Sequence, residues 1–459
     1  MSQRRQLNLN LFIYPGGHHE AAWRYKGSAA SRALDISYYQ QLARTAEHYT
    51  FDAIFFADGP ALADNVRYAQ RFRFEPITWL SAIAAATSRI GLIGTASTTY
   101  HEPYNLARLY ASLDHLSGGR IGWNIVTGYL DSGARGMGLP NNRAHDDRYD
   151  AADEFLAAVY KLWEGSWQPG AVRRDRAAGL FTDSSKVHRV RHDAAHFKVD
   201  GIHLAEPSPQ RTPLLYQAGT STRGRAFAAR HAEAIFLNGQ TRPVLARAVR
   251  EIREAAKDAG RDPYDIRLFA GATVIVAPTR AEAHDLLADY AAHVDQAGQL
   301  ALLSGWAGID FSTYNPDDPI RYVESNAIQS MVENFTVRSE RPVRIGDLAA
   351  LSRAGARSPF VVGSPQDVAD ELIAWADETD VDGFNLFRLV APESLEAFVD
   401  LVVPELQSRG VYKTAYRDGT LREKLFPGRG PLLHTTHPGA GYRDPATLQS
   451  SHHARDAAE

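Results

Sequence analysis

The chain contains no cysteine in its 459 residues. Disulfide bonds, thiolate metal sites and a cysteine nucleophile are therefore excluded. It also lacks an apolar run near the ~18 residues that a membrane-spanning helix requires. The amino terminus leads directly into a strand pattern, without the apolar core and small-residue cleavage site of a signal peptide. We therefore expect a cytoplasmic protein that does not enter the membrane.

An excess of charge of one sign is also missing. The 50 basic and 54 acidic residues are interspersed and leave a net charge of −4. This balance provides no basic field for nucleic acid or for an anionic membrane surface. Four histidines have spacings that resemble a metal site, but no carboxylate partner recurs with them, so we expect no bound metal. They are His188, His192, His196 and His203.

The clearest organisation that is present lies in residues 89–128. An apolar, β-branched run at 90–98 ends in small hydroxyl residues, and a helical pattern follows at 105–116. The pair Gly118-Gly119 ends the helix, and a second apolar run at 120–127 finishes on polar groups. Two strands joined through a helix indicate a parallel, right-handed βαβ unit. Polar groups at the carboxyl ends of both strands suit the ligand-binding mouth of an α/β barrel.

The same alternation continues along the chain and predicts an α/β fold, a (β/α)8 TIM barrel with insertions. Two irregular stretches, about 165–212 and 296–357, interrupt the pattern and are expected to be insertions. We expect one domain over residues 1–426, followed by a Gly-, Pro- and His-rich tail at 427–459 that is flexible or packs on a neighbouring subunit. The eight predicted strands are 7–14, 51–57, 90–98, 120–127, 214–218, 233–237, 268–276 and 383–389.

The strongest local signal for chemistry is the turn after the fifth predicted strand. The sequence QAGTSTRG places Gly219, Thr220 and Ser221 between a buried strand and a helix. Free backbone N–H groups and the positive end of the helix dipole would suit a phosphate monoester. The same pattern suits a simple N-cap at Ser221, and the sequence alone does not separate the two.

Other candidates lie at predicted strand ends and helix starts. Asp58 follows the second strand, where a barrel places ligand contacts but where a turn-forming aspartate is also common. His145 and Tyr149 share one face at the start of a helix, and a plain surface pair fits the same spacing. The adjacent His18 and His19 lie in a Gly-containing loop after the first strand, where they could act as acid or base or be merely solvated.

Several long motifs, in a fixed order, resemble a known family. They are PGGHHEAAWR (15–24), FDAIFFADG (51–59), STTYHEPYNLAR (97–108), LDHLSGGRIGWNIVTG (113–128), HDDRYDAADEFL (145–156), QAGTSTRGRAFAARHAE (217–233), DVDGFNL (380–386) and FVDLVVPELQSRG (398–410). The chain is similar to the nitrilotriacetate/EDTA monooxygenase and dibenzothiophene sulfone monooxygenase family, a branch of the bacterial luciferase-like flavin-dependent monooxygenases. The resemblance extends over nearly the whole chain to about residue 426.

This resemblance implies an enzyme that binds reduced FMN from a separate NAD(P)H:flavin reductase and reacts it with O2 to give a flavin C4a-(hydro)peroxide. The substrate would be a small organic molecule, oxidised with cleavage of a C–N or C–S bond. Members form homodimers or homotetramers. The implied cofactor contacts are Asp58, Thr95, Ser97, Asn124, His145, Tyr149, Gly219, Thr220 and Ser221. The implied substrate side has His18, His19, Trp23 and Arg24.

Two other functions stay open at this point. One is a non-catalytic flavin-binding relative, and the other is a deazaflavin-dependent oxidoreductase that transfers hydride. The full set of mouth residues disfavours the first, and the motifs match the FMN branch better than the second.

Overall fold

The computed structural model describes residues 6–19, 21–59, 74–219, 221–239, 241–294, 297–300, 304, 310–311, 314–320, 343–347 and 359–445. Thr220 and most of the predicted insertion 296–357 lie outside these ranges. No helix in the described ranges is long and apolar enough to cross a membrane.

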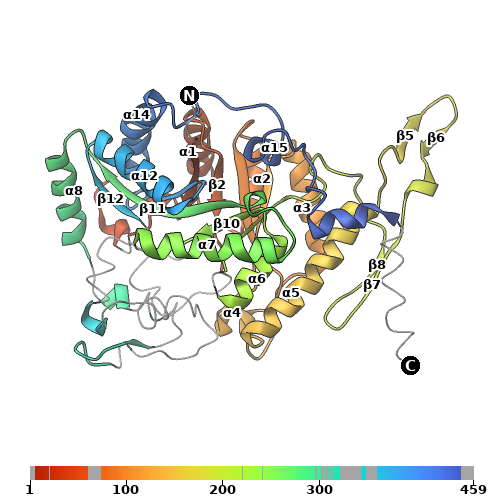
Figure 1. Ribbon diagram of the computed structural model, residues 1–459, viewed down its shortest axis with the longest axis horizontal. Helices are drawn as coiled ribbons and strands as arrows, with labels where there is room; N and C mark the ends of the chain where they lie inside the picture. Colours follow the sequence, from red (N-terminus) through yellow and green to blue (C-terminus); the bar gives the residue numbers. More distant parts are fainter. Residues whose placement is uncertain are drawn as a thin grey trace.

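Eight parallel strands form a closed barrel with helices around it (Figure 1). Each strand pairs with the next one in the order given below, and the last pairs with the first, so the sheet has no open edge within the barrel. This confirms the predicted (β/α)8 barrel. The strands are β1 (Asn8–Ile13), β2 (Ala53–Phe56), β3 (Gly91–Ser97), β4 (Ile121–Val126), β9 (Leu214–Gln217), β10 (Ala234–Leu237), β11 (Arg267–Val276) and β13 (Gly383–Phe387).

The helices begin and end where the local sequence offers capping groups. Thr279 and Ser364 each form a capping box with the acidic residue three positions later, and this starts α8 and α12. α3 ends at Gly118, which adopts a left-handed φ of 66°. The helices are α1 (Ile36–His48), α2 (Pro76–Ala84), α3 (Pro103–Ser117), α4 (Asp131–Gly136), α5 (His145–Tyr160), α6 (Thr222–His231), α7 (Arg242–Asp258), α8 (Arg280–Ala292), α12 (Pro365–Thr379), α13 (Glu393–Ala397), α14 (Val403–Ser408) and α15 (Leu421–Leu425).

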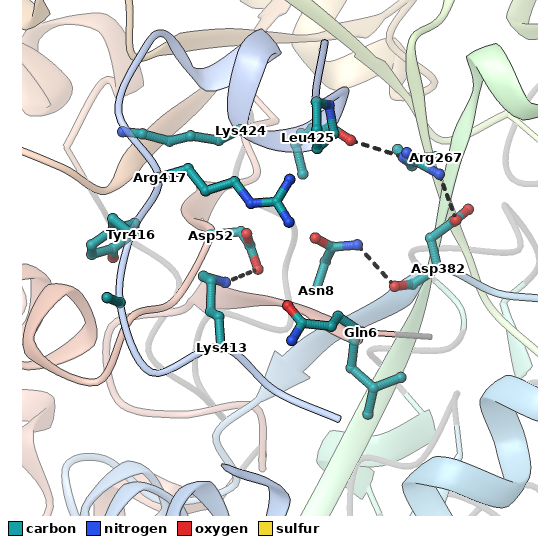
Figure 2. A pocket seen from close by; sticks show the side chains of 13 residues that line it. Gln6, Asn8, Asp52, Arg267, Asp382, Lys413, Tyr416, Arg417, Lys424 and Leu425 are labelled. Carbon is teal, nitrogen blue, oxygen red and sulfur yellow. Dashed lines mark hydrogen bonds and ion pairs between the residues drawn. The ribbon is translucent and has the colours of Figure 1, made fainter. Parts of the chain in front are cut away.

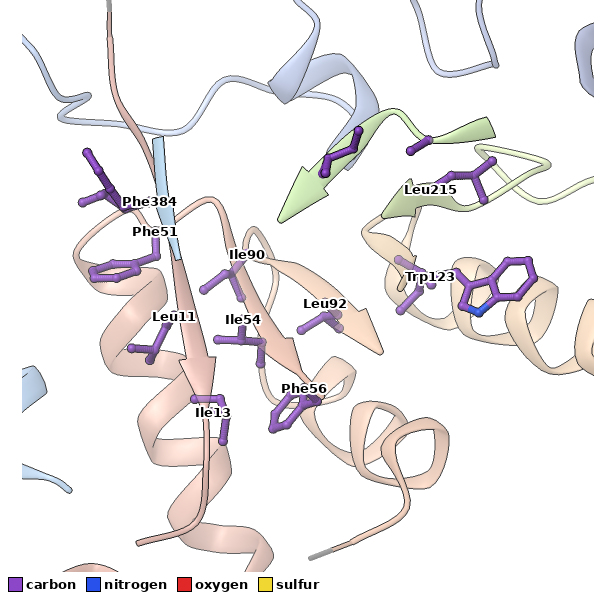
Figure 3. Close-up of a cluster of buried hydrophobic side chains, with 14 of the residues drawn as sticks. Leu11, Ile13, Phe51, Ile54, Phe56, Ile90, Leu92, Trp123, Leu215 and Phe384 are labelled. Carbon is purple, nitrogen blue, oxygen red and sulfur yellow. The ribbon is translucent and has the colours of Figure 1, made fainter. Parts of the chain in front are cut away.

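The strands alternate between two apolar surfaces. Leu11, Ile54 and Leu92 belong to the layer between strands and helices, which Figure 3 shows on neighbouring strands. Their neighbours in sequence, such as Phe55 and Ile93, belong to a separate buried cluster inside the barrel. Because both surfaces of a barrel strand are buried, the runs are almost continuously apolar, as the sequence showed.

The amino-terminal end of the barrel is closed by α15. Leu421, Leu425 and Phe426 are buried in the same cluster as the interior side chains Phe55 and Phe269. Burying a side chain of this kind contributes roughly 1.5–3 kcal/mol. The carboxyl ends of the strands, where barrels of this kind bind their ligands, lie at the opposite end.

The stretch 165–212 contains two small antiparallel hairpins that extend from the barrel at the right of Figure 1. They are formed by β5 (Val172–Asp175) with β6 (Leu180–Thr182), and by β7 (Val190–Asp193) with β8 (Lys198–Gly201). A further strand, β12 (Phe360–Gly363), pairs with the end of β11 outside the closed ring.

The described part of the predicted tail, 427–445, packs against the chain's own barrel. Leu433, His437 and Ala440 are buried, and the Arg443 Nε donates to the Glu164 carboxylate at 2.6 Å. A flexible tail is therefore a wrong prediction for these residues, because they bury apolar surface and pair charges. The division at residue 426 remains a prediction, and residues 446–459 lie outside the described ranges.

Candidate active site

Polar side chains of β3 and β4 meet at the mouth of the barrel. Thr95 and Asn124 are register partners on the two strands, and both are buried. The Thr95 hydroxyl donates to the Phe56 carbonyl at 2.7 Å and accepts a hydrogen bond from Asn124 Nδ2 at 2.8 Å. This chain of bonds fixes the amide, so that the buried Asn124 Oδ1 has no partner among the described residues. A buried carbonyl oxygen of this kind suits a ligand N–H group.

Two further predicted residues lie near this pair in the fold. Ser97 is the last residue of β3 and is buried, and its hydroxyl accepts from the Thr99 backbone at 3.2 Å. Asp58 follows β2 and is partly exposed. All of these residues belong to carboxyl ends of adjacent strands, as the predicted ligand-binding mouth requires.

The starts of α5 and α6 converge beside the carboxyl end of β9. Ser221 is the N-cap of α6, and its hydroxyl accepts from the Gly224 backbone at 3.1 Å. His145 is the first residue of α5, and its Nε2 lies 3.3 Å from the Ser221 hydroxyl. Two helix amino termini thus point their partial positive charge at one place.

Tyr149 completes this corner one turn further along α5. Its ring centroid lies 5.2 Å from that of His145. A Cβ atom added to Gly219 would lie 2.6 Å from the Tyr149 hydroxyl and 2.4 Å from Gln217 Nε2, so a larger residue would displace these two side chains. Burial raises the pKa of Tyr149, which keeps the phenol neutral and able to donate a hydrogen bond.

The arginine in the first turn of α6 already pairs with two aspartates. Arg223, in the first turn of α6, donates to Asp150 at 2.7 Å and to Asp153 at 2.5 Å. Its guanidinium lies over the Tyr149 ring, 5.7 Å from the centroid. An anion in this corner would therefore be held by helix termini and neutral donors rather than by Arg223.

The two candidate histidines have different environments. The His18 ring packs on Phe12 and Phe387 at the end of β1 and β13, with centroid distances of 4.9 and 4.6 Å. His18 Nδ1 lies 3.1 Å from the Arg388 carbonyl, so this nitrogen carries a proton and donates it to the carbonyl. His19 is only 4% exposed and accepts from the Ala21 backbone through Nδ1 at 3.1 Å. His18 therefore lies with the aromatic side chains at the barrel end, and His19 is buried within its loop.

The contacts bring together some of the predicted residues and leave others apart. Thr95 and Asn124 form one hydrogen-bonded pair, and His145, Tyr149, Gly219 and Ser221 form a second group. Trp23 belongs to neither group. It lies in a short 3-10 helix, and 49% of its surface is exposed.

Sequence reasoning missed two residues that support these groups. Gln217 accepts from the Gly219 backbone at 2.6 Å and shapes the turn. Arg388 is buried after β13, and its guanidinium donates to the Tyr38 hydroxyl and the Tyr14 carbonyl. Both are polar residues at the end of an apolar strand, which is the signal that could have found them.

The described residues fit a flavin mononucleotide better than a metal ion. The corner at α5 and α6 can hold a phosphate, and the buried Asn124 Oδ1 can accept from a ring N–H. No cluster of three or more histidine and carboxylate side chains that could hold a metal is found in the described part of the chain.

Known proteins resemble this chain over most of its length. Residues 17–382 match the luciferase-like monooxygenase family. The chain is 39% identical over 453 residues to dimethyl-sulfide monooxygenase of Hyphomicrobium sulfonivorans, covering 96% of this chain and 94% of that protein. It is 37% identical to nitrilotriacetate monooxygenase component A of Aminobacter aminovorans, with 93% and 97% covered.

A solved structure is similar over the same range. Riboflavin lyase (RcaE), with modified FMN and its substrate riboflavin, superposes with a TM-score of 0.90 at 37% identity, covering 96% of this chain and all of that one. The chain belongs to the luciferase-like monooxygenase family and is a flavin-dependent monooxygenase.

Proposed function

We propose that this chain is the oxygenase of a two-component system that takes FMNH2 from a separate NAD(P)H:flavin reductase and uses O2 to oxidise a small organic molecule. The observation that carries the proposal is the paired construction of the mouth. An amide with a buried free oxygen lies on β4, and two helix amino termini meet after β9, the neighbouring strand in the barrel.

In this proposal each group has a separate task. Asn124 and Thr95 orient the flavin ring, with Asp58 and Ser97 beside it. His145, Tyr149, Gly219 and Ser221 hold the phosphate, and Thr220 is assigned to the same turn from its place in the sequence. When bound, the reduced flavin supplies the activation of oxygen, and the protein contributes position and a dry pocket.

The aromatic residues at the end of β1 and β13 supply that dry pocket. Phe12, Phe387 and Phe236 lie within 5.2 to 6.1 Å of one another, measured between ring centroids. His18 packs on this cluster and is the histidine that we assign to the substrate side, while His19 keeps the loop in place. Trp23 would border the substrate from the loop's exposed side.

The partner and the reaction rest on the relatives. One of them is named component A, which supports a second component that supplies reduced flavin. The names of the relatives include a sulfide and a tertiary amine, which supports cleavage of a C–S or C–N bond here. A cytoplasmic location and a homodimer or homotetramer remain predictions.

The test is reconstitution with a separate flavin reductase, NADH, FMN and O2. We expect oxidation of a thioether or amine substrate only when the chain and the reductase are both present. Hydrogen peroxide is scavenged in every reaction, so that free reduced flavin cannot account for the product. Product from a plain alkane but from no sulfide or amine would contradict the proposed bond cleavage.

The two alternatives give different results in the same assay. A non-catalytic flavin binder would take up FMNH2 but form no product with any substrate. A deazaflavin-dependent oxidoreductase would bind the deazaflavin in preference to FMN and would not consume O2.

A further inference from the structure

The helices α5 and α6 face each other along about two turns, starting at the proposed phosphate corner, where His145 meets Ser221. Residues four apart lie on one face of a helix, so the contact repeats once per turn. One turn below the corner, the Tyr149 ring packs on Phe227 with 5.5 Å between centroids. The facing residues are His145, Tyr149 and Asp153 on α5, and Arg223, Phe227 and His231 on α6.

Asp153 bonds the two helices together below this corner. Its Oδ2 accepts from Arg223 Nη2 at 2.5 Å, and its Oδ1 accepts from His231 Nε2 at 2.7 Å. The Asp153 side chain is 23% exposed and that of His231 only 4%. Arg230 lies further from the carboxylate, at 3.9 Å, and is more than half exposed. One residue of α5 thus bonds to both the first and the last turn of α6.

The His231 ring is itself held in place. Burial lowers its pKa in spite of the neighbouring Asp153, so the ring is neutral and carries one proton. The Tyr160 hydroxyl donates to Nδ1 at 3.2 Å, which leaves that proton on Nε2, facing Asp153. The carboxyl-terminal segment adds a hydrogen bond from His437 Nε2 to the His231 carbonyl at 2.8 Å. The donor to Asp153 therefore has a fixed position and a fixed direction.

The other partner of Asp153 reaches the corner. The Arg223 guanidinium lies over the Tyr149 ring, 5.7 Å from its centroid, and also donates to Asp150 at 2.7 Å. The Asp150 side chain is 64% exposed, so water competes with this second pair, whereas Asp153 is largely shielded. Asp153 therefore sets the position of Arg223, and through it the position of the Tyr149 ring.

We infer that Asp153 is a positioning residue of the phosphate corner: it sets the gap between the amino termini of α5 and α6, and thereby the affinity for the phosphate group of FMN. It acts through Arg223 and His231 and does not contact the phosphate. A hydrogen bond needs about 2.7–3.2 Å between donor and acceptor, so a small shift of one helix would separate the donors on α5 from those on α6. The inference rests on the proposed function, which gives this corner a flavin phosphate to hold.

The test measures the affinities for FMN and for riboflavin, which lacks the phosphate, by flavin fluorescence titration. Asp153→Asn keeps the size of the side chain but removes the charge that holds Arg223. We expect FMN affinity to fall about tenfold, as for loss of one hydrogen bond to a charged group, and riboflavin affinity to stay unchanged. The charge alone predicts the opposite sign, because removal of a carboxylate near a phosphate would strengthen FMN binding.

Asp150→Asn is the matched control, because it removes the same charge from the same arginine and the same helix, at a largely exposed position. It should leave the ratio of FMN to riboflavin affinity unchanged. Asp382→Asn controls for lost stability. It breaks a contact of a buried carboxylate with Arg267 at the amino-terminal end of the barrel (Figure 2). It should lower Tm without changing the ratio.

A double variant tests whether Asp153 acts at the corner. Asp153→Asn with Ser221→Ala should bind FMN about as weakly as Asp153→Asn alone, because a corner already out of position gains little from Ser221. Tm measured without flavin checks that each variant folds. If Asp153→Asn does not fold, Arg223→Gln removes the link between Asp153 and Tyr149 and should show the same loss of FMN affinity without loss of riboflavin affinity.

Several results would overturn the inference. They are unchanged or tighter FMN binding in Asp153→Asn, an equal loss of riboflavin affinity, an equal loss of FMN affinity in Asp150→Asn, and losses that multiply in the double variant. A wild type that binds FMN no better than riboflavin would reject the phosphate corner itself, and the inference with it. That failure is distinguishable, because it appears before any residue is changed.

Discussion

At the scale of single residues, the orientation of Asn124 depends on Thr95. The threonine hydroxyl bridges the Phe56 carbonyl and the asparagine Nδ2, so the amide oxygen is left for a ligand. Thr95→Val removes both bonds and lets the amide rotate. We expect FMN affinity to fall about tenfold, with a stability loss of about 1 kcal/mol. Flavin fluorescence titration and urea unfolding measure the two effects.

Thr379→Val provides the control for this change. The Thr379 hydroxyl is also buried and donates to a backbone carbonyl, that of Trp375, at 2.6 Å on α12. Thr379→Val should lower the free energy of unfolding by a similar amount and leave FMN affinity unchanged. Equal loss of affinity in both variants would show that Thr95 has no specific role in the flavin site.

Lys424 gives a pH dependence of stability with a definite sign. Its pKa is lowered to about 8 from the ordinary 10.5, so between these values the unfolded chain binds more protons than the folded one. The free energy of unfolding therefore increases as pH rises from 8 to 10.5. Below pH 8 the lysine is protonated in both states, so its destabilising effect no longer changes with pH. The charged groups that set the shift are Arg120, Arg89, Glu47 and Asp52.

Comparison with Lys424→Gln isolates this contribution from the other titrating groups. The wild type should gain about 1–2 kcal/mol relative to the variant between pH 7.5 and 10, after allowance for partial exposure. Urea unfolding at several pH values measures the difference. A difference that is constant over this range would contradict the lowered pKa.

At the scale of elements, the amino terminus of α6 has two roles. Ser221 caps the helix and faces His145 across the proposed phosphate corner. Ser221→Ala should cost about 1 kcal/mol of stability as a lost N-cap. It should also weaken FMN binding several-fold but leave riboflavin binding unchanged, because riboflavin lacks the phosphate.

The N-cap Ser364 of α12 is the comparison for this effect, because Ser364→Ala removes the same kind of cap at a helix far along the chain. It should lose stability without changing FMN affinity. If Ser221→Ala weakened riboflavin and FMN binding equally, the phosphate assignment would be wrong.

The element that closes the barrel depends on a buried ion pair. Arg422 of α15 donates to Glu233 through Nε at 2.6 Å and through Nη2 at 2.9 Å, and both residues are buried. Removal of one partner leaves a buried charge uncompensated, so Arg422→Leu should destabilise the protein by about 3–5 kcal/mol. Thermal and urea unfolding measure the loss.

The double variant Arg422→Leu with Glu233→Gln tests the cause. It removes the stranded charge and keeps acceptor groups for the backbone of β9, so part of the lost stability should return. A double variant no more stable than Arg422→Leu would assign the loss to packing rather than to the charge.

Helices and strands with a regular spacing of apolar residues could be predicted from the sequence. All eight barrel strands were found within a few residues, because each is a short apolar run followed by a polar strand end. The tail after residue 426 was misread because its glycines and prolines resemble a linker. What orders residues 427–445 is long-range burial of His437 and the pairing of Arg443 with Glu164, and neither leaves a local pattern.

Within the candidate site, the sequence located strand ends but not side-chain directions. His18 and His19 are neighbours and could not be distinguished from their pattern. The structure places the first on Phe12 and Phe387 and buries the second, because the loop turns between them. Gln217 was missed because its role is to shape a turn through a backbone bond.

At the scale of the whole molecule, the two ends of the barrel have different tasks. The carboxyl ends of the strands carry the polar pair and the proposed phosphate corner, and α15 closes the amino-terminal end. The hairpins of the stretch 165–212 extend away from the barrel (Figure 1). Variants in the proposed flavin site and variants in α15 therefore alter opposite ends of the barrel.

The most direct test of the central claim is rapid mixing of the anaerobic protein and FMNH2 with oxygenated buffer. The account predicts an absorbing species, distinct from oxidised FMN, that outlives the oxidation of free FMNH2 and decays faster when a substrate is present. Oxidation at the rate of free flavin, in a protein shown to have FMNH2 bound, would contradict the proposed monooxygenase function.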